Sequence, residues 1–158
     1  MTAERLRALQ AEVRADASFV RIRLDEACTF PAAGASIAEL AYTALAMQRA
    51  YTALESLLER CILAFDGGTP TGPNSHRALL RRAALAIEGS RPALLTPAGA
   101  ATAVEFLRFR HFIRHDYGAE LDADQLGPLQ AAIRDHRAAL EGDLSALDEW
   151  ITALVSAS

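Results

Sequence analysis

The sequence contains no lysine. All sixteen residues that are basic at neutral pH are arginine, against twenty acidic residues, which gives a formal net charge of −4. A protein that binds nucleic acid through general electrostatic attraction is normally basic. Any contact with nucleic acid is therefore expected to come from a local group of arginines. Arginine suits that role because its planar, permanently charged guanidinium matches the geometry of phosphate.

Cysteines and long apolar runs are also scarce. Cys28 and Cys61 are the two cysteines, and they form no CxxC or Cys/His cluster, so they are expected to be small buried residues in a reducing compartment. We predict no metal site and no cofactor. No apolar run reaches the roughly 18 residues of a membrane-spanning helix, and residues 1–10 lack an apolar signal core. A cytoplasmic protein without membrane contact is expected.

The composition of the chain is that of a globular protein. Hydrophobic residues make up 51% of the 158 residues and charged residues 23%, which favours a single folded domain over residues 1–158. No stretch alternates apolar and polar residues over a strand's length. We therefore predict an all-α fold, an antiparallel bundle of about five helices.

Apolar residues at steps of three and four mark the first two helices. In residues 37–65 they run from Ile37 to Phe65 without a break. In residues 2–27 they are Leu6, Leu9, Val13, Ala17, Val20, Leu24 and Ala27. Ser36 and Glu39, three residues apart, predict a capping box at the start of the second helix.

Three shorter patterns follow. A helix is predicted from His76 to Glu88, with Gly89 as its stop, and Thr96-Pro97 opens a fourth helix that ends at about residue 115 or 116. The fifth helix begins either at a cap formed by residues 122–125 or at Pro128. Its apolar stripe is Leu129, Ile133, His136, Leu140, Leu144, Leu147, Ile151 and Leu154.

The most informative stretch is residues 108–117, where three arginines and two histidines stand between apolar residues. A helix turns about 100° per residue, so Arg108 and His115 lie nearly on one line with His111 beside them, and Arg110 lies near Arg114. Apolar residues all round predict that this helix is largely buried. Buried arginines need partners, so the stretch indicates either internal ion pairs or an anionic ligand.

An arginine and a histidine near one helix end can also do chemistry on a phosphodiester. The guanidinium stabilises charge on the non-bridging oxygens, and imidazole can act as general base or acid near neutral pH. The other two histidines, His76 and His136, are interpreted more simply, as a cap or surface group and as a satisfied core residue.

At this point the sequence resembles the HEPN superfamily. Arg110-x4-His115-x-Tyr117 matches its R-x4-H-x-Y motif, and the chain looks most like the HepT-like ribonuclease toxins, which are paired with a minimal nucleotidyltransferase. The order of segments also fits. A long helix containing residues 51–59 is followed by a Gly/Pro loop, then residues 75–80, then the motif helix.

This resemblance implies an all-α homodimer in which the motifs of both subunits face one cleft, and a metal-independent endoribonuclease. Arg110 would hold the scissile phosphate, and His115 would transfer protons as the RNA 2′-hydroxyl attacks, leaving a 2′,3′-cyclic phosphate. Arg108, His111 and Arg114 would support the RNA phosphates. Tyr117 matches the tyrosine to which the nucleotidyltransferase antitoxin attaches AMP, which silences the toxin.

The sequence departs from the family pattern in two ways. His111 stands where many members have Asn or Asp, and Arg108 also satisfies a looser spacing, with six residues between it and His115. Either Arg108 or Arg110 is therefore a candidate for the working arginine. Two alternatives to a nuclease remain: a non-catalytic HEPN-like dimer that binds RNA, a nucleotide or a nucleotidyltransferase, and a bundle whose Arg/His cluster is an interfacial ion-pair network.

Overall fold

The computed structural model of the protein describes the backbone of residues 1–115 and 121–158 and the side chains of residues 1–111 and 121–158. Within these residues the chain forms five α-helices and no strand, which confirms the all-α prediction. Their bounds are α1 Ala3–Ala27, α2 Ile37–Asp66, α3 Ser75–Ala83, α4 Pro97–His115 and α5 Ala123–Ser156. None of the helices so described is both long and apolar enough to cross a membrane.

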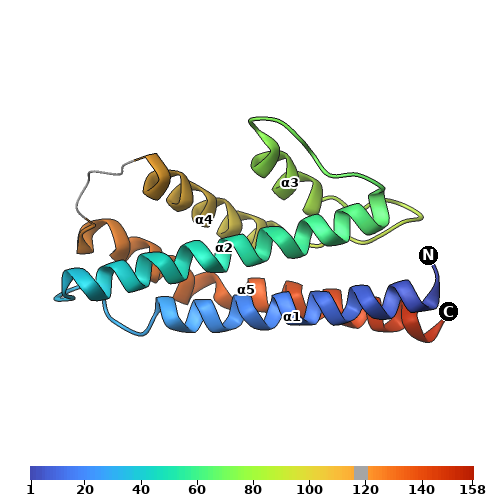
Figure 1. Cartoon of the computed structure of the whole chain (residues 1–158), viewed down its shortest axis with the longest axis horizontal. Coiled ribbons are helices and arrows are strands. Elements are labelled where there is room, and N and C mark those ends of the chain that lie inside the picture. The colour runs from blue at the N-terminus through green and yellow to red at the C-terminus, as the bar shows by residue number, and fades with distance from the viewer. Residues whose placement is uncertain (116–120) are drawn as a thin grey trace.

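The three long helices α1, α2 and α5 lie side by side (Figure 1). α2 runs antiparallel to α1, α5 also runs opposite to α1, and the two termini lie at the same end of the molecule. α3 packs on α2 and α4, and α4 packs on α2, α3 and α5. One hydrophobic core contains residues from all five helices.

Local sequence explains where the first two helices begin and end. The side chain of Thr2 accepts a hydrogen bond from the backbone N–H of Arg5 at the start of α1. Ser36 and Glu39 form the predicted capping box at the start of α2. α2 ends at Gly67, whose φ of 77° lies in the left-handed region that glycine adopts without strain. Every predicted stripe residue of α1 is buried, whereas Ile37 of α2 is exposed, so its assignment to the core was wrong.

A buried glutamine ties the α1–α2 loop to α5. The side-chain amide of Gln130 donates to the carbonyl oxygens of Ala27 and Phe30, and its oxygen accepts from the N–H of Ala32. All three of its hydrogen bonds go to backbone groups, which need such partners where they are shielded from water. The start of α5 is thereby held against the turn that joins α1 and α2.

Asp143 of α5 fixes the start of α4. Its carboxylate oxygen Oδ2 accepts hydrogen bonds from both the backbone N–H and the hydroxyl of Thr96, at 3.0 and 3.2 Å. The Thr96 hydroxyl oxygen in turn accepts from the N–H of Gly99. A Cβ on Gly99 would overlap with the Asp143 carboxylate, so this contact requires glycine. Burial raises the pKa of Asp143, and the hydrogen bonds from Thr96 oppose that rise.

The prediction that the third helix reaches Glu88 is wrong, because α3 ends at Ala83. The carbonyl oxygen of Ala83 accepts from the N–H of Leu94, which turns the chain back. The guanidinium of Arg91 is fully buried. It binds the carboxylate of Asp66 at the end of α2 and backbone carbonyl oxygens of the segment that follows α3. Because these bonds require residues 84–91 to leave the helical path, they override the local helical pattern of this segment.

The fifth helix also differs from part of its prediction. It begins at Ala123, where Asp122 and Gln125 form a capping box, and Pro128 lies inside it. The cap therefore sets the start and the proline does not delay it. His136 is exposed rather than a satisfied core residue. Of the other stripe residues, Ile133, Leu140, Leu144, Leu147 and Ile151 are buried, and Leu129 and Leu154 are half-buried.

Candidate functional site

Side chains from α2, α3 and α4 meet around one arginine of the predicted motif. α3 and α4 splay apart toward the start of α3 and the end of α4, with α2 beneath them (Figure 1). Arg110 of α4 lies in this region with 14% of its side chain exposed. Around it are His76, the second residue of α3, and Tyr51 and Glu55, which are one helical turn apart on α2.

Arg110 contacts all three of these residues. Its guanidinium nitrogen Nη1 lies 3.1 Å from Nε2 of His76 and 3.8 Å from Oε2 of Glu55. Its Cζ lies 5.6 Å from the centre of the Tyr51 ring, within the range of a cation–π interaction. Arg110 is thus a cation held by an imidazole, a carboxylate and an aromatic ring.

Hydrogen bonds connect the members of this group. Nδ1 of His76 is hydrogen-bonded to Oε1 of Glu55, and the Tyr51 hydroxyl donates to the same oxygen at 3.4 Å. An arginine can only donate, and Nη1 of Arg110 lies 3.1 Å from Nε2 and 3.4 Å from Nδ1 of the His76 ring. The imidazole tautomer with its proton on Nδ1 satisfies both neighbours, because it donates to Glu55 and accepts from Arg110 at Nε2. A continuous line of hydrogen bonds runs from Arg110 through His76 to a carboxylate that is itself buried.

The charges around Arg110 shift two pKa values. Burial raises the pKa of the Tyr51 hydroxyl well above its ordinary value, the negative charge of Glu55 adds to the rise, and Arg110 opposes it. The pKa of Glu59, one turn further along α2, is also raised by burial and by Glu55, and lowered by His76 and Arg110. The Tyr51 hydroxyl therefore stays protonated at physiological pH. Arg110 is the cation that balances the carboxylates on this part of α2.

The structure treats the two candidate arginines differently. Arg108 has 65% of its side chain exposed and forms a surface ion pair with Glu105 at 2.7 Å. Arg110 is mostly buried and is bound by other helices. His111 is exposed, and its ring centre lies 6.3 Å from that of His76. Arg110 and His111 are therefore brought together with His76, and Arg108 lies apart from this group.

The remaining predicted site residues cannot be placed in the same way. The side chains of Arg114 and His115 and the whole of Tyr117 lie outside the described residues.

Two members of the cluster were missed by the sequence reasoning. His76 was interpreted as a cap or surface group, which is wrong, because it is partly buried and bridges Glu55 and Arg110. Glu55 was not singled out, although an acidic residue inside the run Leu54-Glu55-Ser56-Leu57-Leu58 could have indicated a buried carboxylate. A buried carboxylate needs a cationic or hydrogen-bonding partner. Its partners come from helices 21 and 55 positions further along the chain, which local patterns do not reveal.

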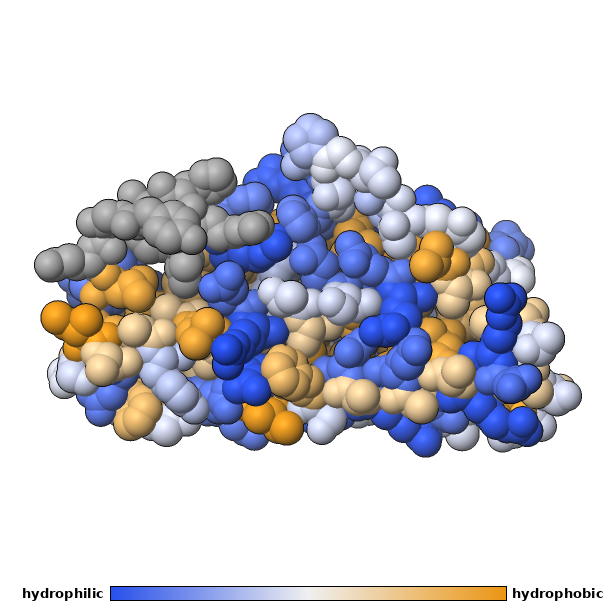
Figure 2. Space-filling model, in the orientation of Figure 1, coloured by the Kyte–Doolittle hydropathy of each residue, from blue (hydrophilic) through white to orange (hydrophobic). Residues whose placement is uncertain are grey.

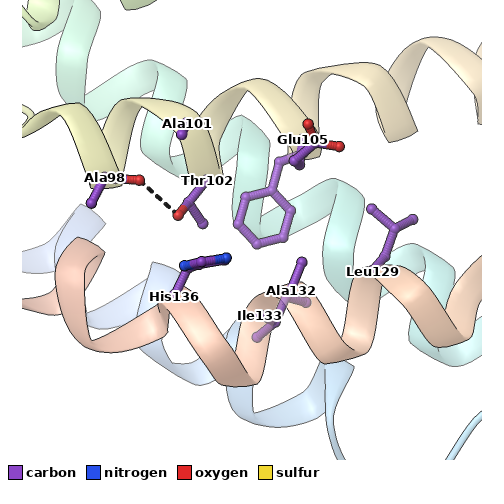
Figure 3. A pocket seen from close by; sticks show the side chains of 9 residues that line it. Ala98, Ala101, Thr102, Glu105, Leu129, Ala132, Ile133 and His136 are labelled. Carbon is purple, nitrogen blue, oxygen red and sulfur yellow. Dashed lines mark hydrogen bonds between the residues drawn. The ribbon is translucent and has the colours of Figure 1, made fainter.

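Two of the hollows beside α4 differ in the character of their lining. One lies between α4 and α5, has a volume of about 410 Å³ and is mostly apolar. Figure 3 shows His136 of α5 and Thr102 of α4 facing it, with the Thr102 hydroxyl already donating to the carbonyl oxygen of Ala98. The other lies between α3 and α4, has a volume of about 760 Å³ and includes three arginines in its lining. Only the second hollow offers an anionic ligand several positive charges.

The all-helical bundle of the described residues is consistent with an HEPN-like fold. The family model described as "HepT-like protein" matches residues 42–151, which extend from α2 through most of α5 and include the whole cluster. The chain therefore belongs to the HepT-like family. No curated protein sequence and no solved structure matched it.

Proposed function

We propose that the protein is the endoribonuclease toxin of a toxin–antitoxin pair and acts as a homodimer whose two motifs share one cleft. The observation that carries this proposal is the Arg110 guanidinium, held by His76, Glu55 and Tyr51 within the motif segment of a HepT-like chain. A permanently charged group that is fixed in advance costs little reorganisation when it stabilises a reacting phosphate.

In the proposed reaction Arg110 binds the non-bridging oxygens of the scissile phosphate. His115 removes the proton of the adjacent RNA 2′-hydroxyl, and the 2′-oxygen attacks phosphorus. The bond to the 5′-oxygen breaks, and that oxygen takes up a proton as it leaves. The products are a 2′,3′-cyclic phosphate and a 5′-hydroxyl end. No metal ion takes part, because the charge is stabilised by arginine and the protons are moved by histidine.

The geometry of Arg110 leaves donors for a substrate. A guanidinium carries five N–H donors, and the hydrogen bonds of Arg110 to other described residues are formed by Nη1 alone. Nε and Nη2 can donate in parallel to two oxygens of one phosphate. His76 and Glu55 would then hold Nη1, while the phosphate of the substrate binds Nε and Nη2.

The proposal includes the partner and the regulation that the family resemblance implies. Tyr117, seven residues after Arg110 in the motif, would receive AMP from a minimal nucleotidyltransferase antitoxin. The added phosphate and nucleoside would occupy the position of the RNA phosphate and block the cleft. Arg108, His111 and Arg114 would contribute further contacts to RNA phosphates.

A second candidate function is a non-catalytic HEPN-like dimer that binds a nucleotidyltransferase or nucleotide. It is favoured by the ion pair between Glu55 and Arg110, which already compensates the charge of the arginine. It predicts a stable complex with the partner and no cleavage of RNA.

Growth on expression of the protein separates the two candidates. The wild-type chain should arrest growth, and Arg110→Ala and His115→Ala should each abolish the arrest at equal protein level. Arg5→Ala, an exposed residue of α1, is the matched control and should arrest growth like the wild type. Arrest that persists in both Arg110→Ala and His115→Ala would contradict the nuclease proposal.

A mass spectrum of the protein co-expressed with its neighbouring gene tests the regulation. One or more AMP units should appear on the peptide that contains Tyr117. An unmodified peptide together with relief of growth arrest would show that the partner acts by binding alone.

A further inference from the structure

The hollow between α3 and α4 is an arginine-lined groove with an apolar floor. Arg77 and Arg81 of α3 and Arg108 of α4 contribute its charges. The floor is formed by small and aliphatic residues, namely Leu80, Ala84, Pro97, Ala100, Ala101 and Val104. Figure 2 shows hydrophilic residues in the region of α3 on the face in view. A ligand that fits must be anionic along one side and able to rest on an apolar surface.

The charge of this groove is concentrated on α3. The nine residues of that helix include three arginines and a histidine and no acidic residue, in a chain whose net charge is −4. Arg77 and Arg81 are both exposed, and neither forms an ion pair or a side-chain hydrogen bond with another described residue. Among the described residues, the carboxylate bound to an arginine of the groove is that of Glu105, which pairs with Arg108. The α3 side of the groove is therefore open to an anion.

We propose that this groove binds a short single-stranded RNA segment next to the scissile bond, which rests on the nuclease function proposed above. Arg77 and Arg81 are four residues apart, about 6 Å along one face of the helix, and can contact neighbouring phosphates of one strand. The bases of a single strand are free to turn onto the apolar floor. An RNA duplex is recognised across about 16 base pairs, and a helix of nine residues, about 14 Å long, offers too short a row of charges for it.

The groove and the Arg110 cluster share the same two helices. Arg77 directly follows His76 on α3. Arg108 precedes Arg110 by two residues on α4 and therefore points about 200° away from it. The connection between the two sites is thus the start of α3, and in this proposal a strand whose scissile phosphate lies on Arg110 continues past His76 to Arg77 and Arg81. In this arrangement Arg110 determines the chemistry, and Arg77 and Arg81 determine how firmly the flanking nucleotides are bound.

Binding is measured separately from cleavage with a strand that cannot be cut. A fluorescent single-stranded RNA whose 2′-hydroxyls are all methylated lacks the nucleophile but keeps its phosphates and bases. The double variant Arg77→Gln/Arg81→Gln should bind this probe several-fold more weakly than the wild type. Its plot of log affinity against log salt should be less steep by about 1.4, because about 0.7 is lost for each phosphate contact of a single strand.

The matched control is Arg5→Gln/Arg7→Gln, which removes two exposed arginines from α1, a helix that packs on α2 and α5 and not on α3 or α4. It should bind like the wild type. All three proteins should have similar melting temperatures, because none of the four arginines forms an ion pair or a side-chain hydrogen bond among the described residues. A duplex of the same sequence should bind the wild type more weakly than the single strand.

Three results would overturn the proposal. They are equal weakening in both double variants, unchanged affinity in Arg77→Gln/Arg81→Gln, and a duplex that binds more tightly than the single strand. Unchanged affinity with a shift to monomers would show that a second copy of the chain covers the groove. Failure of the nuclease proposal gives a different result. If Arg77→Gln/Arg81→Gln binds the probe more weakly but the wild type does not cleave ordinary RNA, the groove proposal stands and only the proposed cleavage reaction is contradicted.

Discussion

Nη1 of Arg110 lies 3.1 Å from Nε2 of His76, and this contact joins α4 to the first turn of α3. The opposite side of the same imidazole is bound to Glu55 of α2. Three helices are thus connected through one histidine, and the direction in which the guanidinium points depends on that ring. In the proposed reaction His76 is a positioning residue, because it holds Arg110 and does not itself touch the phosphate.

Replacing His76 tests this role. His76→Ala should lower kcat for RNA cleavage by on the order of 10²-fold, the effect of misplacing a catalytic group by about 1 Å, with little change in KM. His76→Gln should recover part of the loss, since an amide can accept from Arg110 and donate to Glu55. Equal kcat values for the wild type and His76→Ala in single-turnover assays would show that Arg110 is held without the histidine.

The two arginines of the motif segment should have different effects. Arg110→Lys should abolish most activity, because an ammonium group cannot donate in parallel to two phosphate oxygens as a guanidinium does. Arg108→Gln should raise KM and leave kcat nearly unchanged, because Arg108 is exposed and paired only with Glu105 among the described residues. Steady-state kinetics on a short RNA distinguish them, and the reverse pattern would assign the chemistry to Arg108.

Helical periodicity was sufficient for most of the fold. The seven predicted stripe residues of α1 are all buried, and the capping box of α2 is present where Ser36 and Glu39 predicted it. These features depend on residues three or four positions apart, which a sequence shows directly. The end of α3 could not be predicted in this way. It depends on Arg91 reaching Asp66, 25 residues earlier, and long-range bonds of that kind have no local pattern.

The same limit applies to the candidate site. Arg110 was recognised from the spacing of the motif, but the sequence left Arg108 equally plausible because helix geometry alone cannot say which arginine meets another helix. His76 was misjudged for a related reason. It follows a Gly/Pro loop, where an exposed histidine is common, and only the packing of α3 on α2 brings it to Glu55.

The ion pair between Asp66 and Arg91 should contribute strongly to stability. Both side chains are almost fully buried, and two nitrogens of Arg91 donate to the two oxygens of Asp66 at 2.8 and 2.9 Å. Asp66→Asn leaves the guanidinium without a counter-charge and should lower the free energy of unfolding by about 3–5 kcal/mol. Asp135→Asn, an exposed residue of α5, is the control and should change it by less than about 0.5 kcal/mol.

The effect of Asp66 should also depend on pH. The hydrogen bond from Arg91 holds the pKa of Asp66 below its ordinary value, and Arg82 acts in the same direction. Its stabilisation is therefore complete above about pH 4, the ordinary pKa of aspartate, and is lost as the pH falls through the lower pKa of the folded state. Urea unfolding should show that the difference in the free energy of unfolding between the wild type and Asp66→Asn is smaller at pH 3 than at pH 7. The same difference at both pH values would mean that the pKa of Asp66 is not lowered in the folded protein.

Two glycines in helices should respond in opposite ways to alanine. Gly99→Ala places a Cβ against the Asp143 carboxylate and should cost about 1–3 kcal/mol, the usual effect of overpacking. Gly142→Ala in α5 meets no atom within 4 Å and should stabilise by about 0.5–1 kcal/mol because alanine favours the helix. Thermal unfolding of both variants measures the difference, and a stable Gly99→Ala would indicate that Asp143 does not hold Thr96.

The proposed chemistry is tested most directly by the ends of the RNA that the purified protein produces in the presence of EDTA. The account predicts cleavage products with 2′,3′-cyclic phosphate and 5′-hydroxyl ends for the wild type, and none for folded Arg110→Ala or His115→Ala protein. Cleavage that stops when EDTA is added, or identical products from the wild type and Arg110→Ala, would contradict it.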